Sequence, residues 1–146
     1  MEIQITTEVG IPGSGSRKIR QKMKRVLKDL GCDDKELSIL FTGDEHISRL
    51  NRKYRNKEGP TNVLAFPMAG GPEPRVEMGV LGDVVVSVET ACRESADIHE
   101  PLEETIDRLL IHGLLHLLGY DHEISFKEAE RMEEEEKRIM RLMREA

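Results

Sequence analysis

Apolar residues along the chain follow two spacings, one typical of strands and one typical of helices. Short alternating or β-branched runs predict four strands, over 2–9, 36–42, 62–66 and 81–89. Helical spacing predicts five helices, over 16–31, 44–59, 90–98, 101–118 and 125–144. Strands dominate the first half of the chain and helices the second. This order predicts an α+β domain rather than an alternating α/β fold.

The helix predicted over 101–118 has apolar residues around most of its circumference. They are Leu102, Ile106, Leu109, Leu110, Leu114, Leu115, Leu117 and Leu118. A helix that is apolar nearly all round belongs in the interior of a domain. Any functional group that it carries therefore projects from a rigid support. By contrast, the glycines and prolines of 68–78 predict an irregular surface loop.

Size and composition narrow the class of protein. A chain of 146 residues with 38% apolar residues fits a single domain, spanning 1–146, with its own core. It has no apolar run of membrane-spanning length, and its first residues form a strand pattern rather than a secretory leader. We therefore expect a cytoplasmic protein with no membrane partner. Cys32 and Cys92 form no paired motif, so we expect free thiols and no disulfide.

The charge is unevenly distributed. A net charge of −6 argues against a nucleic-acid partner, yet residues 17–28 contain seven Lys or Arg and residues 49–57 contain five, with no acid in either stretch. The segment 123–146 is acidic, with a glutamate block at 133–136. These basic stretches are either solvated helix faces or a surface that binds a polyanion.

Three of the five histidines fall in the segment HGLLHLLGYDH, residues 112–122. His112 and His116 are four residues apart, so a helix presents both on one face. Gly119 can then end the helix in a left-handed conformation and let the chain bring His122 back to the same point. Three imidazoles with an open fourth position are typical of a catalytic zinc site, although other divalent metals also bind imidazole.

The same spacing occurs in metzincin peptidases, whose pattern is H-E-x-x-H-x-x-G-x-x-H. The position of their catalytic glutamate is Gly113 here, so the general base of a peptidase is missing. Asp121 is either an acceptor that orients a histidine or a turn residue, and Tyr120 is expected to pack at the helix end. His46 and His99 have no partners in the sequence and are expected at the surface.

Three segments of the chain resemble those of a known family. The segments HGLLHLLGYDH (112–122), LNRKYRNKEGPTNVLAFP (50–67) and LGDVVVS (81–87) are similar, in this order, to those of the YbeY family of metal-dependent endoribonucleases. The resemblance implies a zincin-like fold, with a mixed four-stranded sheet packed against helices and a central helix that carries the histidines. Ala65 is a small departure, because members commonly have serine there.

The resemblance also implies roles for residues. His112, His116 and His122 match zinc ligands, and Arg55 matches a basic residue that the family needs for activity. Arg52 and Lys53 are expected to help bind substrate. The implied activity is cleavage of single-stranded RNA in 16S rRNA 3′-end maturation and ribosome quality control, with ribosomal RNA and the small subunit as partners. Asp83 is equally compatible with a structural role and a role in the site.

Two other functions stay open at the level of sequence. One is a different metallohydrolase, such as a peptidase-like zincin, which the histidine spacing favours and Gly113 opposes. The other is a ribosome-assembly factor that binds RNA and uses the metal chiefly to stabilise its fold. For the leading hypothesis, an arginine fork that matches a phosphate explains why Arg55 belongs beside a metal site.

Overall fold

The computed structural model describes residues 2–11, 15–67 and 79–144. Its strands are β1 (Glu2–Thr7), β2 (Glu36–Thr42), β3 (Val63–Pro67) and β4 (Val80–Ser87). Its helices are α1 (Ser16–Asp29), α2 (Asp44–Arg55), α3 (Val88–Asp97), α4 (Leu102–Leu117) and α5 (Phe126–Arg144). Each predicted strand and helix is present, and the α+β class is confirmed. The loop predicted over 68–78 lies outside the described residues.

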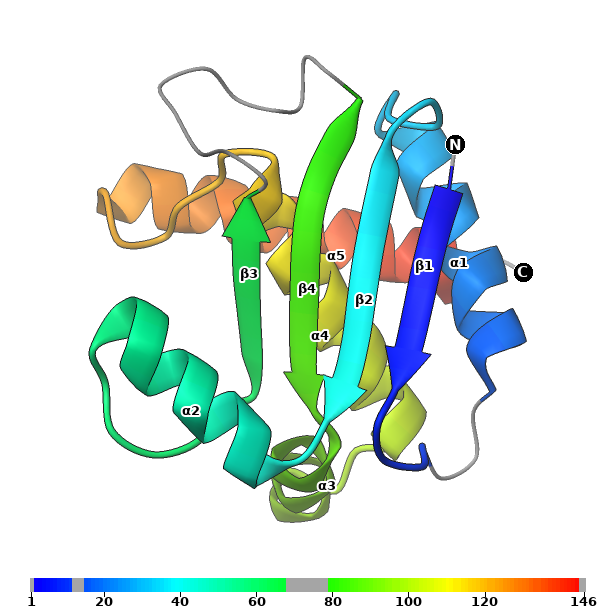
Figure 1. The fold of residues 1–146 in the computed structure, drawn as a ribbon. Coiled ribbons are helices and arrows are strands. Elements are labelled where there is room, and N and C mark those ends of the chain that lie inside the picture. The colour runs from blue at the N-terminus through cyan, green and yellow to red at the C-terminus, as the bar shows by residue number, and fades with distance from the viewer. Residues whose placement is uncertain (1, 12–14, 68–78, 145–146) are drawn as a thin grey trace.

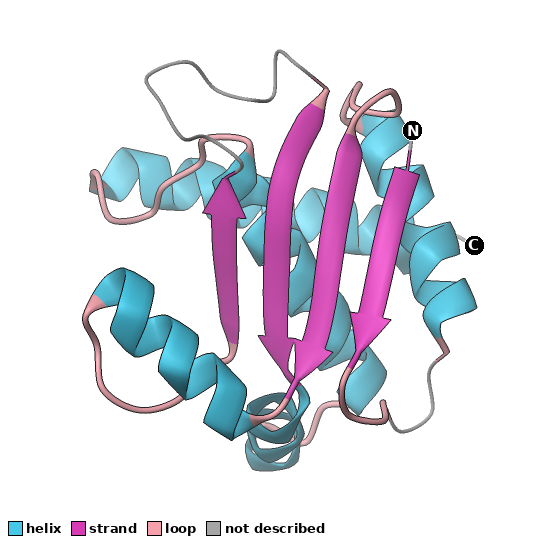
Figure 2. Cartoon of the chain, in the orientation of Figure 1, coloured by secondary structure: helices cyan, strands magenta, loops and turns pink. Residues whose placement is uncertain are grey.

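The four strands form one mixed sheet in the order β1-β2-β4-β3. β1, β2 and β4 run parallel, whereas β3 pairs antiparallel with β4 at one edge. Side chains alternate along β4: Val84 and Val86 join the main core, and Val85 joins a smaller cluster with Ile47 of α2. Helices α1, α4 and α5 cover one face of the sheet (Figure 1). Helix α2 lies at the β3 edge (Figure 2), and its Ile47 packs on the other face with Leu64 and Val85.

Helix α4 is the central helix that its apolar residues predict. It contacts β3, β4, α3 and α5, and Leu110, Ile111 and Leu114 are almost completely buried. Gly113 permits its close approach to the sheet. A Cβ atom at this position would lie 2.7 Å from Cγ1 of Val84 and 3.3 Å from Cγ2 of Val63. The glycine is therefore a packing residue, because a side chain there would force the Val84 side chain to shift.

Two polar residues of α2 have distant partners. The sequence predicts Asp44 as the N-cap of α2, because aspartate is common there, but Gly43 takes this position. The Asp44 carboxylate instead accepts hydrogen bonds from the hydroxyls of Ser87 and Thr90, both at 2.6 Å. His46 is partly exposed at the surface, and its Nδ1 atom lies 2.7 Å from Oε1 of Glu8, a partner that the sequence does not indicate. His99 is exposed, as expected.

In the part of the chain that the structure describes, no helix has both the length and the apolar character needed to cross a bilayer. Cys32 is buried, Cys92 is partly exposed, and both are free thiols, as predicted.

Candidate metal centre

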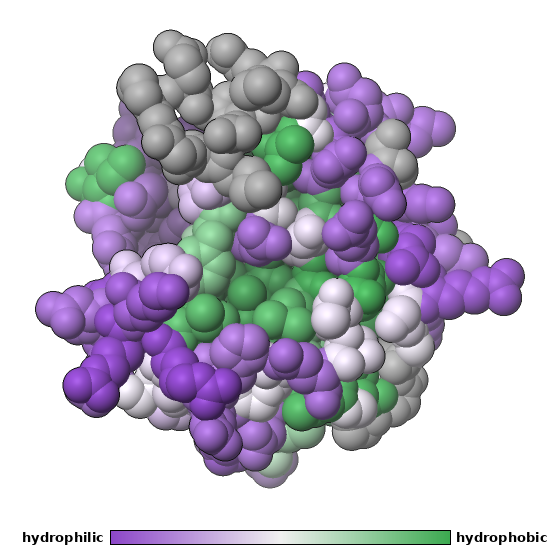
Figure 3. All heavy atoms as spheres, viewed as in Figure 1, coloured by the Kyte–Doolittle hydropathy of each residue, from purple (hydrophilic) through white to green (hydrophobic). Residues whose placement is uncertain are grey.

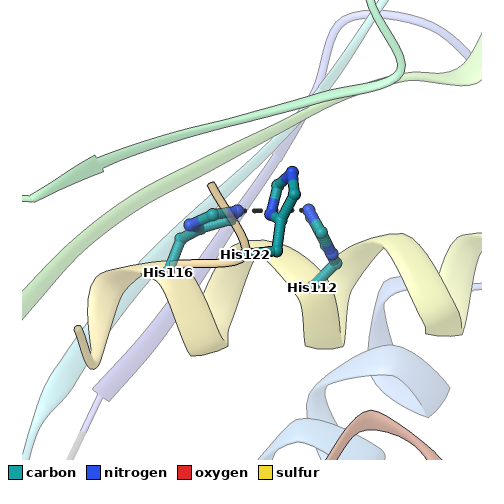
Figure 4. Close-up of side chains that lie close together, drawn as sticks. All are labelled: His112, His116 and His122. Atoms are coloured by element: carbon teal, nitrogen blue, oxygen red, sulfur yellow. Dashed lines mark hydrogen bonds between the residues drawn. The ribbon is translucent and has the colours of Figure 1, made fainter. Parts of the chain in front are cut away.

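The three histidines of the motif converge above the C-terminal half of α4 (Figure 4). His112 and His116 lie one turn apart on this helix. Gly119 follows with φ of +99°, the Gly119 N–H donates to the carbonyl of His116, and the Tyr120 N–H donates to that of Leu115. These bonds form a Schellman motif, which ends the helix and reverses the chain. The loop after it carries His122 back to the other two rings.

The separations fit a shared metal ion. Each histidine offers a ring nitrogen within 4.8 Å of those of the other two. The Nε2 atoms of His112 and His116 are 3.2 Å apart. Two ligands at the usual Zn–N distance of about 2.0–2.1 Å in a tetrahedral site would be separated by about 3.3 Å. The three side chains can therefore hold one ion with little rearrangement.

Glu136 of α5 supports the site from behind. Its Oε1 atom lies 2.6 Å from Nδ1 of His112, the ring nitrogen opposite the one that approaches His116. A carboxylate in this position accepts the Nδ1 proton, which leaves the Nε2 lone pair free for a metal. The sequence analysis missed this residue, because Glu136 lies within the acidic block at 133–136 and no local signal separates it from its neighbours.

The pKa of His116 also suits a metal ligand. Burial lowers the pKa of His116 below its ordinary value, and the nearby His112 and His122 lower it further. The neutral imidazole is therefore favoured at this position. That is the form in which histidine binds a metal ion.

A cleft of about 600 Å³, here called the histidine cleft, opens in front of the three rings. Residues 61–67 of the edge strand region form one wall, and the end of α2 contributes Tyr54 and Arg55. The loop after α4 adds Asp121 and Glu123. The fold thus brings the two strongest sequence signals, the histidine motif and the segment 50–67, to one cavity.

The three basic residues that were expected to take part in substrate binding differ in their position relative to the histidine cleft. Arg55 is exposed and lines the histidine cleft, whereas Arg52 and Lys53 are not among its lining residues. The Nε atom of Arg52 lies 3.7 Å from Glu58, and Nζ of Lys53 lies 5.1 Å from the ring centre of Tyr54. Tyr54 lines the cleft but was not predicted, although it stands directly before Arg55 in the motif.

Three other candidates take structural positions. Oδ1 of Asp121 accepts the backbone N–H of Glu123 at 2.8 Å, so this carboxylate shapes the turn that carries His122. Tyr120 packs against the core, and its hydroxyl donates to Glu135. Asp83 lies in β4 beside a separate groove and is not among the lining residues of the histidine cleft. Burial raises the pKa of Asp83, while a hydrogen bond from Ser38 opposes this shift.

Comparison with known proteins agrees with these features. A family model described as "Endoribonuclease YbeY" matches residues 4–144. A relative from Persephonella marina, named Endoribonuclease YbeY, is 43% identical over 130 residues, covering 89% of this chain and 84% of that protein. A relative of the same name from Geobacter sulfurreducens is 41% identical over 144 residues, covering 98% and 96%.

A solved structure is also similar. The solution structure of a protein from Thermotoga maritima matches with a TM-score of 0.67 at 25% identity, covering 97% of this chain and 88% of that one. The family model covers nearly the whole sequence, including the strands, the helices and the histidine motif. This chain belongs to the endoribonuclease YbeY family, whose members are hydrolases that act on RNA.

Proposed function

We propose that this protein is a zinc-dependent endoribonuclease that cuts single-stranded RNA. The observation that carries the proposal is the arrangement of three histidine nitrogens within 4.8 Å of one another. They share a cleft with Arg55. Imidazole ligands suit zinc, and His112, His116 and His122 would hold it with one position open. A zinc ion there supplies a Lewis acid that withdraws charge from a phosphoryl oxygen and favours the ionisation of water.

The chain's own residues bind and orient the RNA. Arg55 offers a planar fork of donors that matches a phosphate and stabilises negative charge that develops on it. The histidine cleft has the volume of a small-ligand site, about 600 Å³, so it suits a strand whose bases are unpaired. Gly113 stands where a peptidase has its catalytic glutamate, and a Cβ atom there would press on Val84, which disfavours a longer side chain.

The proposed substrate is ribosomal RNA, at the 3′ end of 16S rRNA, with the small ribosomal subunit as partner and the cytoplasm as location. Support comes from the segments 50–67, 81–87 and 112–122, which resemble those of the YbeY family. Cleavage of a precursor containing the 16S 3′ end, compared with an unrelated single strand of equal length, tests this specificity. Equal rates on both RNAs would contradict it.

Two variants test the chemistry. We expect His112→Ala to lose zinc and cleavage together, and Arg55→Glu to reduce cleavage on the order of 100- to 1,000-fold while retaining zinc. The measurements are zinc content by mass spectrometry and cleavage of a labelled single strand. Lys24→Glu, an exposed charge reversal on α1, controls for total charge. Parallel purification controls for contaminating nucleases, and cleavage that survives in His112→Ala would refute the assignment.

A further inference from the structure

An aromatic pair, with one exposed and one partly buried ring, stands at the rim of the histidine cleft. The rings of Tyr54 on α2 and Phe66 on β3 meet edge to face, with centroids 5.1 Å apart. Tyr54 remains 58% exposed. Of the large hydrophobic side chains that are exposed in the described residues, Tyr54 alone lines this cleft. Such exposure of an aromatic ring beside a catalytic cavity indicates a contact surface for substrate.

The pair also lines a second hollow. A groove of about 790 Å³, here called the sheet groove, lies on the face of the sheet opposite α4. Its floor includes the apolar residues Leu40 and Val85, and Figure 3 shows hydrophobic residues gathered in this hollow. Tyr54, Phe66 and Pro67 line both the groove and the histidine cleft. An aromatic ridge therefore joins an apolar surface to the candidate metal centre.

Basic residues stand beside the aromatic ring of Tyr54. Arg52, Lys53 and Arg55 of α2 lie next to Tyr54 in sequence and are exposed. The sheet groove carries two acids: Asp83 lies across from Phe66 in the antiparallel strand pair, and Glu8 contacts His46 of α2. A phosphate backbone is attracted to the basic end of α2 and repelled from the carboxylates of the sheet groove. The charge pattern therefore favours a strand that follows the end of α2 and directs a base, rather than a phosphate, toward the aromatic ridge.

We propose that the Tyr54 ring, supported by Phe66, is a stacking site for one unpaired base of the RNA, with an adjoining phosphate at Arg55. This inference rests on the proposed function and names how its substrate is held. A base in a duplex is covered on both faces by its neighbours, so it cannot reach the ring without unstacking. Stacking on Tyr54 thus gives the cleft a preference for single strands that is independent of sequence.

Binding of a single-stranded RNA that is 2′-O-methylated throughout, and so cannot use its own 2′-hydroxyl, tests the site by fluorescence anisotropy. We expect Tyr54→Ala to weaken binding about 5- to 150-fold. Tyr54→Phe keeps the ring and should restore most of the affinity. Ile98→Ala, a truncation of a side chain that is 55% exposed and does not line either cavity, should bind as the wild type does.

A second measurement separates stacking from an effect on the fold. Removing single bases from the oligonucleotide should identify one position whose loss weakens wild-type binding but scarcely affects Tyr54→Ala. Equal effects in both proteins, unchanged binding by Tyr54→Ala, or a Tyr54→Phe variant as weak as Tyr54→Ala would each overturn the stacking site. If the wild type cleaves RNA and Tyr54→Ala binds the oligonucleotide as well as the wild type does, the stacking site is wrong but the proposed function stands. A wild type that binds the oligonucleotide through Tyr54 but cuts no unmodified RNA would overturn only the proposed function.

Discussion

Glu136 acts on the candidate metal centre through a single contact with His112. The carboxylate lies on α5, 24 residues beyond the histidine, and its side chain is only 20% exposed. A hydrogen bond from Nδ1–H selects one tautomer of the ring and makes its other nitrogen a stronger ligand. It also fixes the direction in which the ring points. Glu136 is therefore a positioning residue for the proposed zinc site.

Replacing this carboxylate should weaken metal binding without removing a ligand. We expect Glu136→Gln to lower zinc affinity about 10- to 100-fold, because the amide keeps the size of the side chain but loses its charge. Competition with a chromophoric chelator measures the affinity. Glu133→Gln, which removes an exposed carboxylate on the same helix, is the matched control. Equal zinc affinities in the Glu136 and Glu133 variants would show that the contact does not tune the site.

Helices α1 and α4 are joined by a small group of ion pairs. Oε1 of Glu103 lies 2.7 Å from Nζ of both Lys18 and Lys22, and Oδ2 of Asp107 lies 2.8 Å from Nζ of Lys22. The hydrogen bonds from Lys18 and Lys22 lower the pKa of Glu103 from 4.5 to about 2. Burial raises the pKa of Asp107, and Lys22 offsets this only in part. The contribution of Glu103 to stability therefore increases as the pH rises, whereas that of Asp107 decreases.

The lowered pKa of Glu103 predicts a contribution to stability that is lost in acid. The contribution should be complete above pH about 4.5, the unfolded value, and should fall as the pH approaches about 2. Because Glu103 is 37% exposed, we expect Glu103→Gln to cost at most about 1 kcal/mol at pH 7. Urea denaturation from pH 7 to pH 3 measures the difference. Glu133→Gln, whose partner Lys137 is on the same helix, is the control, and a difference that grows in acid would contradict the prediction.

Across the whole molecule, the two basic stretches have different surroundings. The stretch 49–57 includes the end of α2, where Arg55 borders the histidine cleft. The stretch 17–28 belongs to α1, which packs against β1 and α5 at the opposite edge of the sheet, and Lys18 and Lys22 there pair with acids of α4. A chain with a net charge of −6 can thus present a local basic surface to RNA at one place.

This asymmetry predicts a difference in salt dependence. Binding of the 2′-O-methylated strand should weaken with salt, because each contact with a phosphate of a single strand releases condensed cations. We expect Lys53→Ala to reduce the slope of log affinity against log salt by about 0.7, the value for one lost phosphate contact. Lys24→Ala, on the exposed face of α1, should leave the slope unchanged. Salt-independent binding, or the same change in both variants, would exclude α2 as the phosphate-binding surface.

Local patterns in the chain are sufficient to predict the elements of the fold and the group of histidines. Each strand and helix depends on a local periodicity of apolar residues, and the spacing of His112, His116 and His122 with Gly119 constrains a helix and its end. These signals lie within a few turns of chain, so they can be recognised before the fold is known. The resemblance of the segments 50–67, 81–87 and 112–122 extended them to a family, which the comparisons support.

Contacts between residues that are distant in the chain are visible only in the folded molecule. The contact of Glu136 with His112, the pairing of His46 with Glu8 and the ridge formed by Tyr54 and Phe66 each join separate elements. A surface glutamate and one that orients a metal ligand look alike in sequence, because their difference lies in the neighbouring element. Gly113 is a further example. Comparison with the metzincin pattern shows only that a glutamate is absent at this position, whereas the packing of α4 on the sheet explains why a glycine is present.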